Sequence, residues 1–145
     1  MTEIVAFEEK YADDIAELEK LCFSSPWSRE AIISSASLPI AVYLVALTDG
    51  VVSGYAGMYA VDDCGQINNI AVSPDHRRRG VGSSLISALV SAAGERGLCR
   101  LTLEVRRSNN AAVRLYEKNG FYRVGVRPGY YSAPKEDAIL YDKDI

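Results

Sequence analysis

Two glycines, Gly80 and Gly82, join an alternating apolar segment to a long helical one. The preceding segment, Gln66–Val72, has the pattern of a strand that ends at Ser73-Pro74. The following residues predict a helix from about Ser83 to Arg96, with Gly97 suited to its C-terminal cap. Its buried face would hold Leu85, Ile86, Leu89, Val90 and Ala93. A strand that passes through glycines into a helix restricts the chain to folds in which helices pack on a sheet.

Short periodic segments on both sides predict the remaining elements. Strands are expected at Ile4–Phe7, Ala41–Leu47, Val51–Ala60, Leu101–Arg106, Phe121–Arg127 and Ala138–Tyr141. Helices are expected at Tyr11–Cys22, from an N-cap at Ser28 through Ile33, and from a cap at Asn109 or Asn110 to Lys118. In the first of these, the apolar residues that recur at helical spacing are Ile15, Leu18, Leu21 and Cys22. Turns are expected at Asp49-Gly50 and at Asp62–Gly65. The order β-α-α-β-β-β-α-β-α-β-β predicts an α+β (mixed α/β) fold with a largely antiparallel sheet and helices on its faces.

Length and composition narrow the class of protein. A chain of 145 residues is the size of one domain, and we expect a single domain over residues 1–145. The net charge of −3 argues against broad nucleic-acid binding. Cys22, Cys64 and Cys99 are far apart, and His76 is the single histidine, so neither a zinc site nor a disulfide framework is expected. Free thiols, together with the lack of a signal or membrane-spanning pattern, predict a cytoplasmic protein.

The glycine loop has the chemistry of a phosphate site. The start of a helix offers free N–H groups and the positive end of its dipole, and Arg77, Arg78 and Arg79 add charge beside it. An arginine-rich loop that is merely solvated explains this segment equally well when it is considered alone. No Lys-Ser/Thr follows Gly82, so the segment is not a nucleoside triphosphate loop, and it lacks the third glycine of a dinucleotide site.

Two side chains after the loop could serve acid–base chemistry. On the strand Leu101–Arg106, Glu104 shares a face with Thr102 and Arg106, opposite the apolar face. Glu104 is either a general base in a cleft or an exposed carboxylate on a half-solvated strand. Tyr116, on the next helix, is either a packed aromatic side chain or a proton donor.

Taken together, these motifs resemble the GNAT acetyltransferases. Arg77-x-x-Gly80-x-Gly82 fits the Q/R-x-x-G-x-G/A acetyl-CoA motif of that family. The chain is most similar to the RimI branch, bacterial enzymes that acetylate the N-terminal amine of a ribosomal protein. The similar segments follow one another over nearly the whole chain: Cys22-Phe23, Pro26–Ser28, Asn69–Pro74, Leu103–Arg106, Ser108-Asn109, Leu115–Glu117, Gly120-Phe121, Arg127, Tyr130-Tyr131 and Asp137-Ala138.

The resemblance implies a GNAT fold with a twisted sheet of six to seven strands, and it implies acetyl-CoA as co-substrate without a metal. It makes Glu104 the base and Tyr116 the acid. Acetyl-CoA would be bound by Ile70, Ala71 and Val72 between two splayed strands, by the loop residues Arg77, Arg78, Arg79, Gly80, Val81, Gly82 and Ser83, and by Asn109. Trp27, Tyr130 and Tyr131 would line the acceptor end, although packing explains these aromatics equally well.

The implied reaction is direct transfer of the acetyl group to the α-amine of a protein, expected to be a small-subunit ribosomal protein. A free α-amine is roughly a tenth neutral at pH 7, whereas a lysine amine is neutral at a few parts in ten thousand, so the α-amine needs less help from a base. The cysteines lie outside the site motifs, which disfavours an acyl-cysteine intermediate. We expect a monomer or weak dimer with no nucleic-acid or membrane partner.

Two departures from the pattern of the branch leave the identity of the acceptor amine undetermined. Arg77 stands where the branch more often has glutamine, and Tyr141 replaces the usual methionine. The alternatives are a GNAT enzyme for another amine (a protein lysine, a polyamine or an aminoglycoside) and a non-catalytic coenzyme-A-binding module. Polyamine and aminoglycoside enzymes would need an acidic acceptor pocket, to which Asp62, Asp63, Glu136 and Asp137 could contribute.

Overall fold

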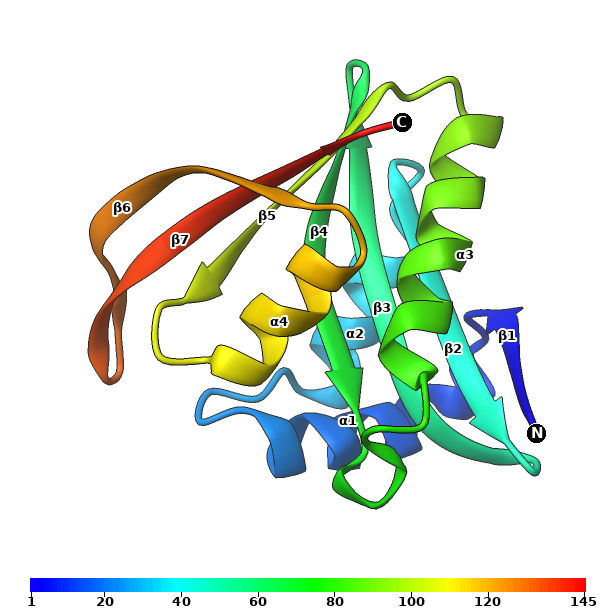
Figure 1. Ribbon diagram of the computed structural model, residues 1–145. Helices are drawn as coiled ribbons and strands as arrows, with labels where there is room; N and C mark the ends of the chain where they lie inside the picture. Colours follow the sequence, from blue (N-terminus) through cyan, green and yellow to red (C-terminus); the bar gives the residue numbers. More distant parts are fainter.

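The computed structural model describes residues 1–145 and contains one seven-stranded sheet with helices on both faces (Figure 1). The strands are β1 (Thr2–Ala6), β2 (Ala41–Thr48), β3 (Val51–Val61), β4 (Cys64–Val72), β5 (Arg100–Arg106), β6 (Tyr122–Ser132) and β7 (Lys135–Asp144). The helices are α1 (Ala12–Cys22), α2 (Arg29–Ala36), α3 (Val81–Glu95) and α4 (Asn110–Lys118), with short 3₁₀ turns at Glu9–Tyr11 and Pro74–His76. The predicted order of elements and the predicted fold class are confirmed.

The sheet order is β1-β2-β3-β4-β5-β7-β6. Every neighbouring pair is antiparallel except β4 and β5, which are parallel because α3 carries the chain back across the sheet between them. The β2–β3 turn has positive φ at Asp49 and Gly50, as the Asp-Gly sequence predicts. The sheet therefore has a single parallel junction, and it lies near the middle.

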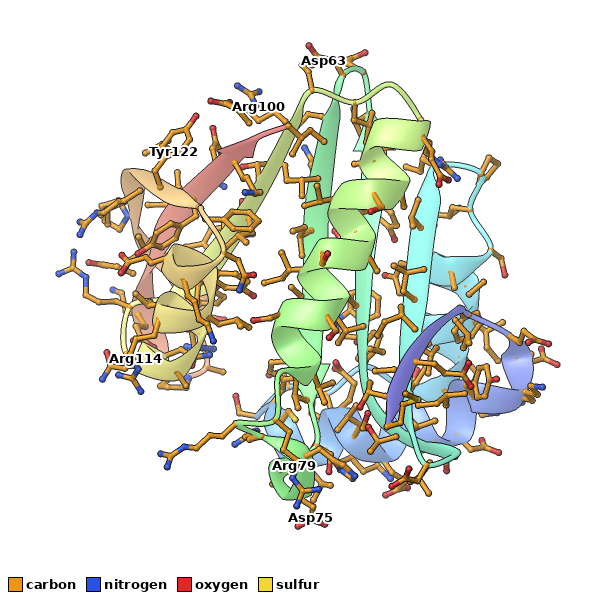
Figure 2. The ribbon with its side chains drawn as sticks, turned by 45° about the vertical axis from the view of Figure 1, so that its right-hand side comes forward. Asp63, Asp75, Arg79, Arg100, Arg114 and Tyr122 are labelled. Carbon is orange, nitrogen blue, oxygen red and sulfur yellow. The ribbon has the colours of Figure 1, made fainter.

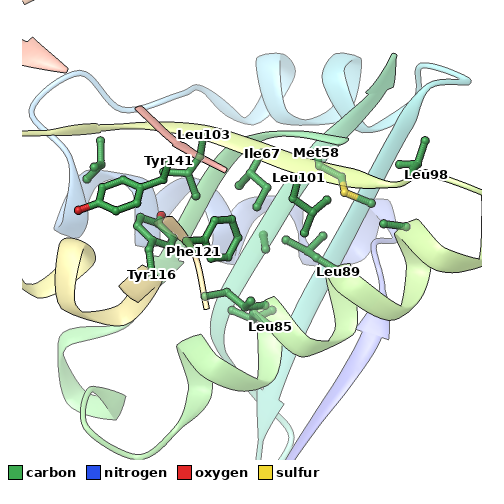
Figure 3. Close-up of a cluster of buried hydrophobic side chains, with 14 of the residues drawn as sticks. Met58, Ile67, Leu85, Leu89, Leu98, Leu101, Leu103, Tyr116, Phe121 and Tyr141 are labelled. Atoms are coloured by element: carbon green, nitrogen blue, oxygen red, sulfur yellow. The ribbon is translucent and has the colours of Figure 1, made fainter. Parts of the chain in front are cut away.

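Two apolar cores lie on opposite faces of this sheet. On one face, α3 and α4 pack against β3, β4, β5 and β7 around Leu85, Leu89, Leu101 and Tyr141 (Figure 3). On the other face, α1 and α2 cover β2 and β3, and Ile15, Leu18 and Ile32 contact Tyr43 and Tyr55. Both cores follow from period-2 strands and period-3.6 helices whose apolar sides face each other.

Several predicted boundaries are wrong. The strands β6 and β7 extend well beyond the predicted Phe121–Arg127 and Ala138–Tyr141, because polar residues form a long hairpin there. Cys64 and Gly65 belong to β4, and the preceding turn is carried by positive φ at Asp62. The helix predicted from Ser83 begins at Val81, so Gly82 is its second residue.

Helix α1 corrects another expectation. Its spacing suggested Leu21 as part of the buried face, yet Leu21 is 66% exposed. Glu19 is buried instead, at 1% exposure. A carboxylate therefore occupies the buried side of this helix, four residues after Ile15.

Candidate functional site

The parallel strands β4 and β5 separate soon after they meet. Their pairing is limited to Cys64 with Arg100, Gly65 with Leu101 and Gln66 with Thr102. Beyond these pairs β4 stays bonded to β3, and β5 stays bonded to β7. Figure 1 shows β5 turning away from β4, with α4 beside the opening and α1 at its lower end. The backbone edge of β4 that faces the opening is therefore left without a partner strand.

A β-bulge shapes this free edge. Gly57 pairs with Asn69 and Met58 pairs with Ile67, so Asn68 is an extra residue in β4. A bulge increases the local twist and re-aims the strand beyond it. That strand segment carries Ile70, Ala71 and Val72, which the family resemblance assigns to acetyl-CoA binding. Val72 is already engaged through its carbonyl, which accepts hydrogen bonds from Arg77 Nε at 3.3 Å and from Cys22 Sγ at 3.5 Å.

The glycine loop leads directly into the start of α3. Gly80 is the N-cap residue with φ of 80°, a left-handed conformation that glycine adopts without strain, and no side chain caps the helix. The first-turn N–H groups are thus available to an anion. Arg77, Arg78 and Arg79 are all exposed around this turn, and Figure 2 shows Arg79 and Asp75 on the loop below the start of α3.

Gly82 has a different role from Gly80. A Cβ at Gly82 would lie 2.9 Å from Leu115 Cδ2, so its lack of a side chain lets α4 pack closely on α3. Asn119 Nδ2 also donates to Ser83 Oγ at 3.1 Å, which links the end of α4 to the same first turn. The loop motif therefore also sets how α4, the helix of Tyr116, is placed.

We expect Gly82→Ala to destabilise the protein by about 1 kcal/mol, because the added methyl group crowds Leu115. Gly94→Ala is the matched control on the same helix: a Cβ there meets nothing within 4 Å. Because alanine is the better helix former, this control should stabilise the protein by roughly 0.5–1 kcal/mol. Urea unfolding of the two variants measures both effects. Equal stability of the two would show that the contact with Leu115 is unimportant.

Glu104 lies on β5 at the opening, with 38% of its side chain exposed. Its neighbours in sequence, Leu103 and Val105, are buried in the core on the other face. The nearest cation is Arg127, whose Nη1 is 3.8 Å from Glu104 Oε1. This exposed pair is worth little energetically, so the carboxylate remains available to another partner.

Tyr116 is 7% exposed and packs in the core between Phe121 and Tyr141, with ring centroids 5.6 Å and 6.5 Å away (Figure 3). Burial raises the pKa of Tyr116 well above its ordinary value, and the nearby Tyr131 adds to this effect. The phenol is therefore protonated throughout the neutral range. Sequence reasoning left open whether this side chain packs or donates a proton, and its environment is compatible with both.

Tyr131 is a further titratable side chain that interacts with both proposed acid–base residues. Burial raises its pKa to about 12, and the charge of Glu104 contributes as the second cause. Tyr131 is thus linked electrostatically both to Glu104 and to Tyr116. Tyr130 contacts Tyr131 edge-on at 5.0 Å between ring centroids.

Arg106, which the sequence did not single out as a functional residue, holds Tyr131 in place. Its guanidinium lies 4.2 Å from the Tyr131 ring centroid and donates to the carbonyls of Ala133 and Pro134 at 3.1 Å and 2.9 Å. It also pairs with Glu136 at 3.3 Å. The one sequence feature that could have indicated this role is the alternation on β5, which places Arg106 on the same face as Glu104. On that face its side chain contacts the β6–β7 hairpin.

Trp27, which the resemblance assigns to the acceptor end, lies in the α1–α2 loop and lines a pocket of about 660 Å³. The lining combines apolar groups with serine hydroxyls: Pro26, Trp27, Ser28, Ala31, Ser34, Ser35, Leu38 and Tyr59. Tyr130 and Tyr131 do not line this pocket; they belong to the β6–β7 hairpin. The loop and the hairpin touch where Ser24 Oγ donates to the Ala133 carbonyl at 3.2 Å.

Asn109 caps α4, since its Oδ1 accepts from the Ala112 N–H at 3.1 Å. The sequence expected a cap at Asn109 or Asn110, and Asn109 is the one. Its oxygen accepts one hydrogen bond from the helix, and its amide nitrogen is left for contact with coenzyme A.

This arrangement of splayed parallel strands, glycine loop and uncapped helix defines a class of enzyme. Residues 12–121 match the family model of the Acetyltransferase (GNAT) family, and the chain belongs to that family. Its members use acetyl-CoA as acetyl donor. No group of three or more histidine, cysteine, aspartate or glutamate side chains that could hold a metal ion is found. None of the helices has the length and apolar character needed to cross a membrane.

The more specific similarities are to one kind of acetyltransferase. The chain is 34% identical over 125 residues to the [ribosomal protein bS18]-alanine N-acetyltransferase of Escherichia coli (strain K12), which covers 85% of this chain and 84% of that one. A Bacillus subtilis (strain 168) protein provisionally named as the same enzyme is 39% identical over 129 residues, 88% of this chain and 85% of its own. The crystal structure of the Escherichia coli ribosomal-protein-S18-alanine N-acetyltransferase superposes with a TM-score of 0.90 at 32% identity, covering 100% of this chain and 94% of that chain.

Proposed function

We propose that this protein transfers the acetyl group of acetyl-CoA to the N-terminal α-amine of a protein, and that the acceptor is a small-subunit ribosomal protein. The assignment of the acceptor rests on the sequence identity of 34% to 39% with the alanine N-acetyltransferases, over about 85% of each chain. The free edge of β4 and the uncapped start of α3 support the donor, because they offer backbone donors and acceptors to the pantetheine arm and N–H groups to the pyrophosphate.

In this proposal the donor site consists of Ile70, Ala71 and Val72, the loop Arg77–Ser83 and the amide of Asn109. The Val72 carbonyl is shared with Arg77, so we propose that Arg77 exchanges this contact for the pyrophosphate. Guanidinium groups bind phosphate oxygens with two parallel hydrogen bonds, which are stronger than one bond to a neutral carbonyl.

The proposed chemistry divides between two side chains. Glu104 accepts the proton of the attacking amine, directly or through a water. Tyr116 donates its proton to the departing thiolate, and its raised pKa keeps that proton in place until then. A thiolate has a pKa near 8.5, so transfer from a phenol of higher pKa requires close contact and desolvation in the enclosed site.

The test is thiol release from acetyl-CoA with short peptides. One set has free N-termini and no lysine, and a matched set has blocked N-termini and one lysine. We expect turnover on the free α-amines and little on the lysines, because the α-amine is roughly a tenth neutral at pH 7. We also expect kcat/KM to rise with pH toward about 8, as the ammonium form is lost. Turnover on lysine peptides or polyamines alone would contradict the proposed acceptor, and no turnover on any amine would contradict an enzymatic function.

A further inference from the structure

Glu19 is a charged residue on the buried side of α1, and the proposed chemistry does not use it. It is 1% exposed, and no lysine, arginine or N-terminal amine forms an ion pair with it. Burying a carboxylate is costly unless hydrogen bonds replace its water shell. A side chain kept under such conditions needs a specific reason.

Three donors from three separate parts of the chain satisfy this carboxylate. Oε1 accepts the backbone N–H of Trp27 at 2.8 Å. Oε2 accepts the Tyr55 hydroxyl at 2.6 Å and Asn69 Nδ2 at 3.1 Å. Asn69 also donates to the Tyr55 oxygen at 2.8 Å, so the polar atoms form one closed network.

Two of the three donors connect the network to the two proposed substrate sites, one donor to each site. Trp27 lies in the loop beside the 660 Å³ pocket on the acceptor side and precedes Ser28, the N-cap of α2. Asn69 immediately precedes Ile70, on the free edge of β4 at the bulge. One carboxylate thus joins the acceptor loop to the strand that faces the donor.

We propose that Glu19 is a positioning residue that holds the α1–α2 loop at Trp27 in the conformation that binds the acceptor. The inference rests on the proposed function for the identity of that acceptor. No substrate contact is assigned to Glu19. It acts through the Trp27 N–H, and its anchor on the other side is the pair Tyr55 and Asn69.

The network predicts a distinctive response to Glu19→Gln. Glutamine has the same shape, but one of its two terminal atoms is a donor. If the oxygen of the new amide faces Tyr55 and Asn69, its nitrogen faces the Trp27 N–H, and two donors meet. If the nitrogen faces Tyr55 and Asn69 instead, it meets the donor Asn69 Nδ2. Glutamine offers one acceptor atom where glutamate offers two, so with Asn69 oriented as it is, either orientation leaves one N–H group without an acceptor, that of Trp27 or that of Asn69. We therefore expect the hydrogen bond to Trp27 to be weakened across the population.

A second substitution provides the matched control. In the double variant Glu19→Gln/Asn69→Asp, the carboxylate moves from position 19 to position 69. The new amide at position 19 can accept from the Trp27 N–H while it donates to the new carboxylate at position 69. The Tyr55 hydroxyl then donates to that carboxylate instead of to Glu19. Every donor again has an acceptor, and the net charge equals that of the natural chain.

The experiment compares the natural protein, E19Q and the double variant in two measurements. Steady-state kinetics with an N-terminal peptide should show the acceptor KM rising about tenfold in E19Q, with kcat and the KM for acetyl-CoA within about twofold. Amide hydrogen exchange of the free protein should show faster exchange at Trp27 in E19Q. The double variant should restore both. An unchanged acceptor KM and unchanged Trp27 exchange in E19Q would overturn the proposal, and so would a general loss of activity and stability that the double variant does not rescue.

Failure of the proposed function is distinguishable from failure of this inference. If the natural protein acetylates no N-terminal peptide, the acceptor proposal is wrong, and exchange at Trp27 still decides the role of Glu19. Faster exchange in E19Q that returns to normal in the double variant supports a positioning role. Equal exchange in all three proteins contradicts it.

Discussion

Glu104→Gln should lower kcat/KM for an N-terminal peptide by roughly 10²- to 10³-fold, because general-base catalysis contributes rate factors of about this size. The amide has the shape of the carboxylate but no basicity. The fold should be retained, since Glu104 is 38% exposed and its ion pair with Arg127 is a surface contact. Steady-state kinetics at several pH values, with a thermal unfolding curve for each protein, gives both results.

The matched control is Glu3→Gln. Glu3 is also a glutamate on a strand, but it is exposed on β1, at the edge of the sheet away from the opening. We expect activity and stability close to those of the natural protein. If Glu104→Gln retained full activity at high pH, where the acceptor amine is already neutral, the carboxylate would serve only to remove that proton. Full activity at every pH would contradict a role as base.

Tyr116→Phe should lower kcat by about 10²-fold while leaving stability within about 0.5 kcal/mol. The ring continues to fill the core between Phe121 and Tyr141. Kinetics and urea unfolding on the same preparation separate the two effects.

Tyr141→Phe is the control for Tyr116, because the two buried rings are neighbours. The Tyr141 hydroxyl donates to Glu117 Oε2 at 2.8 Å and thereby fastens β7 to α4. Its removal should cost about 1 kcal/mol of stability and leave kcat largely intact. The two variants therefore have opposite signatures. If Tyr116→Phe instead lowered the free energy of unfolding together with kcat, the result would indicate a packing role for Tyr116.

Much of the fold could be predicted from local patterns. The Asp49-Gly50 turn, the Ser28 cap and the apolar stripe of α3 each have a cause within a few residues, and the structure has all three. The antiparallel pairing of β2 with β3, of β3 with β4 and of β6 with β7 follows from the short connections between them. The extent of β6 and β7 could not be read in this way, because their outer halves are polar and pair with each other rather than with an apolar core.

The site was less accessible to sequence reasoning than the fold. Alternation on β5 placed Glu104 opposite Leu103 and Val105, as the structure has it. Nothing in the spacing linked Tyr131 electrostatically to Glu104 and Tyr116, since that depends on how the β6–β7 hairpin pairs with β5. Glu19 had a readable signal, a charge at a buried helical position, but its meaning required Trp27, Tyr55 and Asn69 to be placed around it.

The short pairing between β4 and β5 determines where the opening between these two strands begins. Neighbouring strands in a sheet lie about 4.8 Å apart, and each further residue of pairing would extend that spacing by about 3.3 Å along the strands. A gap of that width admits no third chain between the two backbones. Because pairing stops at Gln66 and Thr102, the remainder of β4 can present its main chain to a ligand as it would to a missing strand. The opening is thus a consequence of where the backbone pairing between β4 and β5 ends.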